Sequence, residues 1–119
     1  MARVVIVDDN PEWRAEVRAA VSQAGHEVVA EAADGLEALE IVKALQPDVV
    51  TLDIQMPRMN GVECLAELQQ AENPARVVMV TSVRSSAIQE HCQKLGAAGF
   101  VRKPFEAAEL GLAIEEALR

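Results

Sequence analysis

The sequence has few cysteines, few aromatic residues and no long hydrophobic run, and each shortage excludes a class of protein. Its 119 residues include two cysteines, one tryptophan, two phenylalanines and no tyrosine. Cys64 and Cys92 lack the CxxC spacing and the histidine cluster of a zinc site, and a disulfide framework is not expected. No apolar run is long enough to span a membrane, and none follows Met1 as in a signal peptide. We therefore expect a cytoplasmic protein that does not enter a membrane.

The chain also has few basic residues. It contains 11 lysines and arginines against 19 aspartates and glutamates, which gives a net charge of −8. This balance argues against direct nucleic-acid binding and favours a cationic ligand such as a metal ion. Half of the residues are hydrophobic, and a chain of this length can bury one core. We predict a single domain that spans residues 1–119.

Five short segments have the composition of β-strands. Residues 4–7 (VVIV), 49–52 (VVTL) and 77–80 (VVMV) are continuous apolar runs, which are typical of parallel strands covered on both faces. Residues 27–32 (EVVAEA) and 99–102 (GFVR) are shorter or include charges, which indicates strands nearer the edges of the sheet.

Segments with helical periodicity follow these strands. The expected helices begin at the capping residues Asn10 and Asp34, after Gly61, at a Ser86 to Gln89 capping box and at about Glu106, and the last one ends near Leu118. Trp13 belongs to the apolar stripe of the first helix and is expected to pack in the core. Five alternations of strand and helix predict an α/β fold, a doubly wound parallel sheet with helices on both faces.

Polar residues stand at the carboxyl ends of the predicted strands. Asp8 and Asp9 end the first strand, Asp53 the third, and Thr81 with Ser82 the fourth, while the fifth runs into Lys103 and Pro104. Each residue alone has an ordinary explanation, such as a helix cap, a loop position or a surface charge. The fold, however, carries all of them to one edge of the sheet, where ligands bind in proteins of this class. Three carboxylates, a hydroxyl and an ammonium are therefore expected in one crevice.

The three acids predict a metal site. Adjacent carboxylates repel one another unless a cation neutralises them, so without metal at least one of Asp8, Asp9 and Asp53 should have a raised pKa. Hard oxygen ligands with open positions for water favour Mg²⁺. A carboxylate beside Mg²⁺, a lysine and a hydroxyl can also receive a phosphoryl group. We interpret Asp53, which ends a buried strand, as the nucleophile.

The ordered motifs VVIVDDN, LDIQMPRMNG, VMVTS and GAAGFVRKPF resemble those of the receiver domains of two-component response regulators, most closely the single-domain chemotaxis type. The resemblance spans essentially the whole chain and implies a flavodoxin-like (βα)5 fold with strand order 2-1-3-4-5. It implies that Asp53 accepts a phosphoryl group from the phosphohistidine of a sensor histidine kinase or phosphotransfer protein. Asp9 and Asp53 would bind Mg²⁺ directly with the backbone carbonyl of Gln55, and Asp8 would act mostly through water.

The resemblance also implies a switch driven by the new charge. Thr81, Ser82 and Lys103 would contact the phosphoryl group, and the Lys103–Pro104 bond would be cis. Thr81 would move its hydroxyl towards the phosphoryl group, and Phe100 would swing inward into the vacated space. Many relatives have tyrosine at this position. Phe100 can change rotamer in the same way, but it has no hydroxyl group for a hydrogen bond to a downstream partner.

A docking face for a downstream protein is implied as well. It comprises the fourth helix, the fifth strand and the fifth helix, around Phe100 and Arg102. Leu112 lies roughly opposite the inward stripe of the last helix and is expected to be exposed on this partner face. The chain starts with Met and stops where its last helix should end, which fits a stand-alone regulator and equally a receiver cut from a longer one.

Four alternative functions compete with this prediction. A haloacid dehalogenase-like phosphatase needs a second acid two residues after the nucleophile, where this chain has Gln55. A flavodoxin-like electron carrier needs aromatic residues around its flavin, and only three are present; nucleotide-binding glycine motifs do not occur. A receiver-like module that works without phosphorylation stays open. Otherwise we predict a phosphoacceptor that assists its own phosphorylation and dephosphorylation and is not a conventional enzyme.

Overall fold

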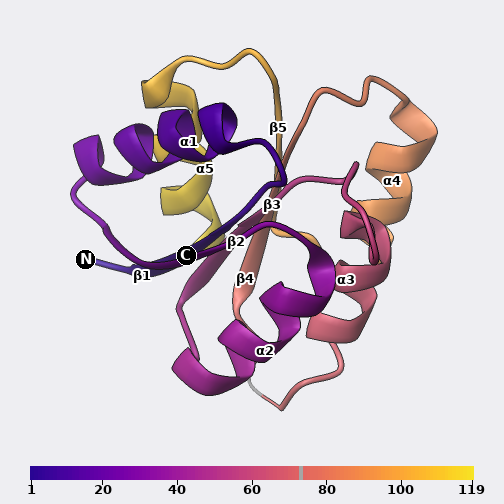
Figure 1. Ribbon diagram of the computed structural model, residues 1–119. Helices are drawn as coiled ribbons and strands as arrows, with labels where there is room; N and C mark the ends of the chain where they lie inside the picture. Colours follow the sequence, from indigo (N-terminus) through magenta and orange to yellow (C-terminus); the bar gives the residue numbers. More distant parts are fainter. Residues whose placement is uncertain (73) are drawn as a thin grey trace.

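The fold is a parallel sheet between two layers of helices (Figure 1). The structure is a computed structural model that describes residues 1–72 and 74–119. Its strands are β1 (Arg3–Val7), β2 (Glu27–Ala32), β3 (Val49–Leu52), β4 (Arg76–Thr81) and β5 (Gly99–Arg102). They pair in parallel in the order β2-β1-β3-β4-β5. The predicted fold class and strand order are confirmed.

The helices cover both faces of the sheet. They are α1 (Pro11–Gln23), α2 (Gly35–Leu45), α3 (Gly61–Leu68), α4 (Ser86–Lys94) and α5 (Ala107–Ala117). α1 and α5 lie on one face, and α2, α3 and α4 on the other (Figure 1). Among the described residues, no helix has the length and apolar character needed to cross a membrane.

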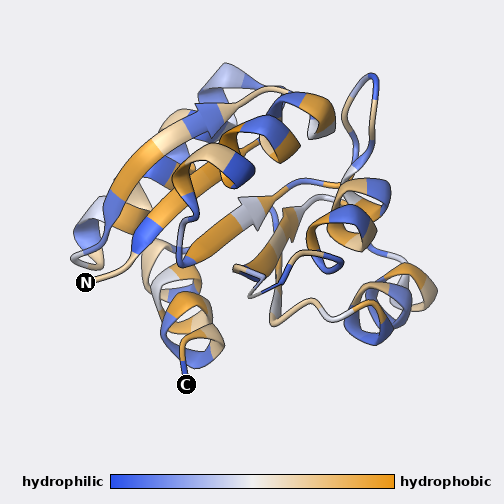
Figure 2. Cartoon of the chain, turned by 90° about the horizontal axis from the view of Figure 1, so that it is seen from below, coloured by the Kyte–Doolittle hydropathy of each residue, from blue (hydrophilic) through white to orange (hydrophobic). Residues whose placement is uncertain are grey.

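Each face of the sheet has its own hydrophobic core. Side chains alternate along a strand, so Val4 and Ile6 of β1 pack with the α1 and α5 cluster, whereas Val5 and Val7 pack on the opposite side. This two-sided burial explains why the central strands are continuous apolar runs. Hydrophobic strands therefore lie between helices that carry hydrophilic residues along their lengths (Figure 2).

Both cysteines belong to the core on the side of α2, α3 and α4. Cys64 in α3 and Cys92 in α4 are free and fully buried. Burial raises the pKa of the Cys64 thiol to about 12, with smaller contributions from Asp34 and Glu67, and burial also raises the pKa of Cys92. The cysteines therefore act as small core hydrophobes.

Side-chain caps hold the first turns of α1, α2, α3 and α4, whereas α5 has no such cap. Asn10 accepts hydrogen bonds from the N–H groups of Glu12 and Trp13 at the start of α1, as its position predicts. The predicted capping box in α4 is wrong. Ser85, not Ser86, is the N-cap, and its hydroxyl accepts from the N–H of Ile88 at 3.2 Å. Two adjacent serines can both cap a helix, and the extended backbone at Ser85 selects between them.

The apolar stripe of α1 is shorter than predicted. Val17, Ala20 and Val21 are buried, but Trp13 is only half-buried and Ala24 is exposed. Ala24 is the C-cap residue, beyond the last helical turn. Trp13 lies in the first turn of α1 and is not one of the buried residues of the core on this face.

Gly61 allows the start of α3 to approach the backbone that follows β3. Its N–H donates to the carbonyl of Ile54 at 2.8 Å. A Cβ atom at this position would overlap the carbonyl oxygen of Asp53 and lie 2.8 Å from the Cα of Ile54. The glycine thus fixes the backbone that presents Asp53.

The substitution Gly61→Ala is expected to destabilise the fold, because the clash involves backbone atoms that cannot rotate away. We expect a loss of about 1–3 kcal/mol in the free energy of unfolding, as for other overpacked sites. Urea unfolding of the parent and the variant measures this loss. Gly99→Ala is the matched control, since a Cβ there meets Val78 at an ordinary 3.5 Å. Equal urea midpoints for Gly61→Ala and Gly99→Ala would contradict the prediction.

Candidate functional site

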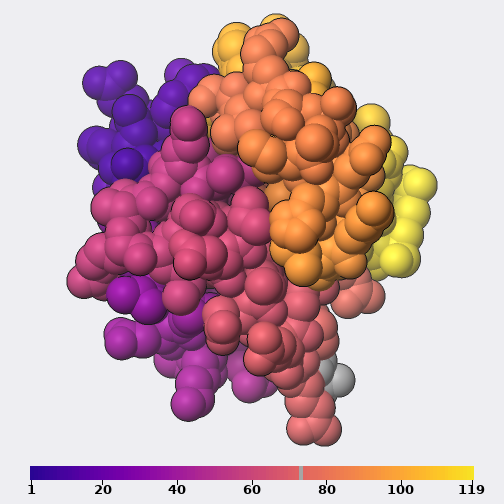
Figure 3. All heavy atoms as spheres, turned by 90° about the vertical axis from the view of Figure 1, so that its right-hand side faces the viewer, coloured from indigo at the N-terminus to yellow at the C-terminus, as the bar shows by residue number. Residues whose placement is uncertain are grey.

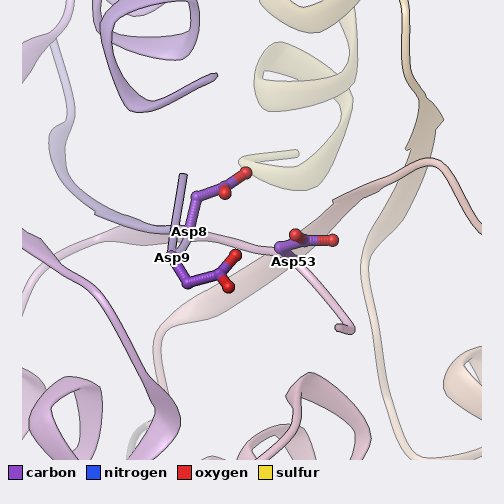
Figure 4. Close-up of side chains that lie close together, drawn as sticks. All are labelled: Asp8, Asp9 and Asp53. Atoms are coloured by element: carbon purple, nitrogen blue, oxygen red, sulfur yellow. The ribbon is translucent and has the colours of Figure 1, made fainter. Parts of the chain in front are cut away.

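Three aspartates meet at the carboxyl ends of β1 and β3, where the strand order reverses (Figure 4). Asp8 and Asp9 follow β1, and Asp53 follows β3. One carboxylate oxygen from each lies within 4.8 Å of the others. Asp8 and Asp53 are buried, whereas Asp9 is exposed. We call this group the acid pocket; it brings together the three acids that the sequence singled out.

Lys103 is buried against the acid pocket. Its Nζ donates to Asp8 Oδ2 at 2.6 Å and to Asp53 Oδ2 at 3.3 Å. The residue follows β5, and the Lys103–Pro104 bond is cis, as the resemblance implied. One ammonium cannot neutralise the charge that three carboxylates can carry. A divalent cation with oxygen ligands would neutralise this excess.

The first turn of α1 orients Asp8. The N–H of Asn10 donates to Asp8 Oδ1 at 2.9 Å, and the guanidinium of Arg14 donates to the Asp8 carbonyl at 2.8 Å. Glu31 of β2 holds Arg14 through an ion pair of 3.3 Å. Sequence reasoning missed Arg14. The available signal was that Arg14 stands one helical turn after Asn10. Residues at this spacing lie on the same side of a helix, so the Arg14 side chain lies near the end of β1.

A second residue of α1, Trp13, was misjudged. It was expected in the core, but its ring lies against the functional site. The Nζ of Lys103 lies 4.9 Å from the ring centroid, and the Phe105 ring lies 5.9 Å away, centroid to centroid. The indole therefore contacts the cation of the acid pocket.

Thr81 ends β4, and the other predicted site residues follow β4 and β3. Thr81 is fully buried, and its hydroxyl accepts a hydrogen bond from the N–H of Val83 at 3.2 Å. Ser82 is exposed, and Val83 is half-buried. Gln55, two residues after Asp53, is exposed. Thr81 and Lys103 are also joined through the backbone, because the Lys103 N–H donates to the Thr81 carbonyl at 2.9 Å.

The predicted partner face contains one exposed leucine and two residues of β5. Leu112 of α5 is 56% exposed, as its position opposite the buried stripe predicts. Phe100 is half-buried, and the guanidinium carbon of Arg102 lies 6.0 Å from its ring centroid. Arg102 also donates to the side chain of Gln89 in α4 at 3.1 Å. On this side of the molecule, α4 (orange) lies beside the end of the chain (yellow) (Figure 3).

Burial raises the pKa of the Asp53 carboxyl above its ordinary value. Lys103 opposes this rise, and the nearby charge of Asp8 adds to it. The expectation of a raised pKa in the cluster is confirmed for Asp53. We expected repulsion between the acids to cause this rise in pKa, but the larger cause is the loss of water around the buried Asp53 carboxylate.

The sequence matches the family model described as response regulator receiver domain over residues 4–115. It is 38% identical to the chemotaxis protein CheY of Listeria monocytogenes over 119 residues, which cover 100% of both chains. The matched region contains the three acids, Thr81 and Lys103.

Solved structures of similar sequence share the fold. A two-component response regulator of the LuxR family from Aurantimonas superposes with a TM-score of 0.93 at 36% identity, over 99% of this chain and 85% of that chain. A chain of the CheX–CheY–BeF3–Mg complex from Borrelia burgdorferi superposes with a TM-score of 0.94 at 30% identity, over 98% of this chain and 89% of that chain.

The substitution Asp53→Asn is expected to stabilise the metal-free protein at neutral pH. Because the pKa of Asp53 is raised, the folded state holds the proton longer than the unfolded state. Stability therefore falls as pH rises from the ordinary carboxyl pKa to the raised one, and the loss persists above it. Asparagine removes this loss, and Lys103 keeps its bond to Asp8. The melting temperature of the variant in EDTA at pH 7 should lie above that of the parent.

Magnesium provides the control for this experiment. A metal that binds the folded acid pocket stabilises the parent by about 2.7 kcal/mol at a hundredfold excess over its Kd. The variant lacks one carboxylate, so its melting temperature should respond less to Mg²⁺. A parent that melts at the same temperature in EDTA and in Mg²⁺ would rule out a metal site, and a variant that melts below the parent in EDTA would contradict the burial argument.

Proposed function

The chain belongs to the family of response regulator receiver domains, and on that basis we propose that it is a phosphorylation-dependent signalling switch of a two-component system. Asp53 is the phosphoacceptor in this proposal. Its donor is the phosphohistidine of a sensor histidine kinase or phosphotransfer protein. One observation carries the proposal: Asp53 is a buried carboxylate 3.3 Å from an ammonium and beside two further acids. Receiver domains are signalling proteins and are generally not classed as enzymes.

Mg²⁺ is the proposed cofactor. Receiver domains bind it at an acidic pocket, and the CheX–CheY–BeF3–Mg complex from Borrelia burgdorferi contains it. The donor set of this chain fits, because three carboxylates lie within 4.8 Å of one another and carry more charge than Lys103 neutralises. We assign direct ligation to Asp9, Asp53 and the backbone carbonyl of Gln55, and a water-mediated role to Asp8. When bound, the ion offsets the repulsion between the carboxylates and the incoming phosphoryl oxygens.

The proposed reaction is a transfer between two side chains. A carboxylate oxygen of Asp53 bonds to phosphorus as the P–N bond of the phosphohistidine breaks, and the electron pair of that bond stays on the imidazole nitrogen. Lys103 then pairs with the phosphoryl oxygens and stabilises their charge, and Ser82 and Thr81 offer hydroxyl groups at the same edge. Because Lys103 already donates a hydrogen bond to Asp53, its ammonium lies close to the position of a phosphoryl group on that side chain.

The phosphoryl group would change the packing of β4 and β5. The Thr81 hydroxyl now accepts from the Val83 N–H. Its movement towards the phosphoryl group would free this N–H and alter the loop that leads into α4. Phe100 on the neighbouring strand would turn inward into the space left by Thr81. These two arrangements form a bistable switch between the acid pocket and the surface.

The proposed output is the docking of a downstream protein on α4, β5 and α5. Phe100, Arg102 and Leu112 belong to this partner face. The net charge of −8 supports a protein target rather than direct binding to nucleic acid or a membrane surface. The proposal places the protein in the cytoplasm, which suits its two free cysteines.

Phosphorylation at Asp53 can be tested without a kinase. A carboxylate flanked by Mg²⁺ and lysine is expected to take a phosphoryl group from acetyl phosphate by itself. Intact-mass spectrometry should show one added phosphoryl group in the parent with Mg²⁺, and none with EDTA. Asp53→Asn should show none in either buffer. Undiminished uptake by this variant would show that the acceptor lies elsewhere, and no uptake by the parent would favour a module that works without phosphorylation.

The lifetime of the phosphoryl group should depend on Gln55 and Val83. They stand two residues beyond Asp53 and Thr81, where their side chains border the path of the attacking water. Gln55→Ala and Val83→Ala are expected to open this path and speed the loss of phosphate several-fold. Stability should change little for Gln55→Ala, because Gln55 is exposed, and by about 1 kcal/mol for Val83→Ala, because Val83 is half-buried and packs against the core.

Decay of the phosphorylated protein after removal of the donor measures this lifetime. Leu36→Ala is a suitable control, because Leu36 is 42% exposed on α2, outside the acid pocket. Parental decay rates in both test variants would mean that Gln55 and Val83 are ordinary loop residues.

A further inference from the structure

We propose that Trp13 is a positioning residue for phosphoryl transfer: its indole ring holds the ammonium of Lys103 in the acid pocket. This inference rests on the proposed function and adds to the site a side chain of α1. The sequence pattern had assigned Trp13 to the hydrophobic core, and the structure places it against a charge.

The contact between the ring and the ammonium has the geometry of a cation–π interaction. The Nζ of Lys103 lies 4.9 Å from the ring centroid of Trp13, inside the range of about 6 Å over which such contacts attract. Indole is the strongest of the aromatic partners. The same ammonium bonds the carboxylates of Asp8 and Asp53. Lys103 is thus held by two anionic oxygens and an aromatic ring.

The ring is itself held in place. The ring of Phe105 lies 5.9 Å from that of Trp13, with the planes inclined by 35°. The backbone N–H of Trp13 donates to the side chain of Asn10, which fixes the first turn of α1. The core under α1 does not require the indole, because Val17, Ala20 and Val21 already form the buried face of the helix. The half-buried ring is therefore free to serve Lys103.

Holding Lys103 matters because lysine is a flexible side chain with a compact charge. If the lysine side chain became ordered only when the phosphoryl group arrived, the loss of conformational entropy would weaken phosphoryl binding. A lysine that is already ordered avoids this loss. Trp13 supplies this ordering and covers part of the ammonium from water. Since the ring acts on Lys103 and the metal is bound by the acids, the effect on phosphoryl binding can be separated from the effect on Mg²⁺.

Beryllofluoride, which mimics a phosphoryl group on a carboxylate, is the probe for the test. Its affinity in saturating Mg²⁺ is measured by ¹⁹F NMR for the parent, Trp13→Leu and Trp13→Phe. Trp13→Leu keeps an apolar side chain without an aromatic face and should bind at least roughly two- to fivefold more weakly, since a cation–π contact contributes about 0.5–1 kcal/mol at an exposed site and more when the cation is buried. Trp13→Phe restores the aromatic face and should recover most of the affinity. The Mg²⁺ concentration that gives half of the thermal stabilisation should stay unchanged in both variants.

Val17→Ala is the control for a general loss of stability. Val17 is buried one turn further along α1, so its truncation weakens the core while beryllofluoride should bind as in the parent. If Trp13→Leu does not fold, Trp13→Met replaces it, because methionine fills irregular gaps well.

Four outcomes decide the question. Weakened binding in Trp13→Leu or Trp13→Met, recovery in Trp13→Phe and parental binding in Val17→Ala together support the inference. The inference is overturned if Trp13→Leu or Trp13→Met binds beryllofluoride with the affinity of the parent. It is also overturned if Trp13→Phe binds beryllofluoride as weakly as Trp13→Leu. A parent that binds no beryllofluoride overturns the proposed function itself, and this inference with it.

Discussion

A buried ammonium shared by two carboxylates is the interaction on which the functional end of this molecule depends. Lys103 reaches Asp8 and Asp53 from positions 95 and 50 residues away in the sequence, and so ties the ends of β5, β1 and β3 together. Removing this ammonium is expected to cost about 3–5 kcal/mol, because both buried carboxylates would be left without compensation, whereas loss of one carboxylate leaves Lys103 paired with the other. The acids that follow β1 and β3 are therefore compensated by the lysine that follows β5.

The compensation is incomplete, and this imbalance gives the site its chemistry. One lysine cannot neutralise three carboxylates, so the folded chain retains an unfavourable concentration of negative charge at one edge. A fully neutralised cluster would be more stable but would have little affinity for a cation. The N-terminal turn of α1 adds order without removing charge, because Asn10 and Arg14 donate hydrogen bonds to Asp8 from outside the acid pocket.

Local pattern predicted the elements of the fold better than their arrangement. Apolar runs such as residues 4–7 identify buried strands because a strand covered on both faces has no polar side. The strand order came from the resemblance, since no local signal says which strands pair. The three acids and Lys103 could be placed at one edge because parallel strands point the same way.

Trp13 could not be placed, because helical periodicity assigns a residue to a face but does not say whether a core or a charge lies beneath it. The choice between Ser85 and Ser86 as the cap also depended on backbone geometry that composition does not encode.

The burial of both thiols has a practical consequence for following the molecule in solution. Thiolate is the form of cysteine that reacts with maleimides, and burial disfavours it at Cys64 and Cys92. A cysteine introduced at an exposed position such as Leu112, by the substitution Leu112→Cys, would be the accessible thiol of the folded protein. Spin labels or fluorophores can then be attached to α5 with both native cysteines left in place, so the core that they fill need not be disturbed.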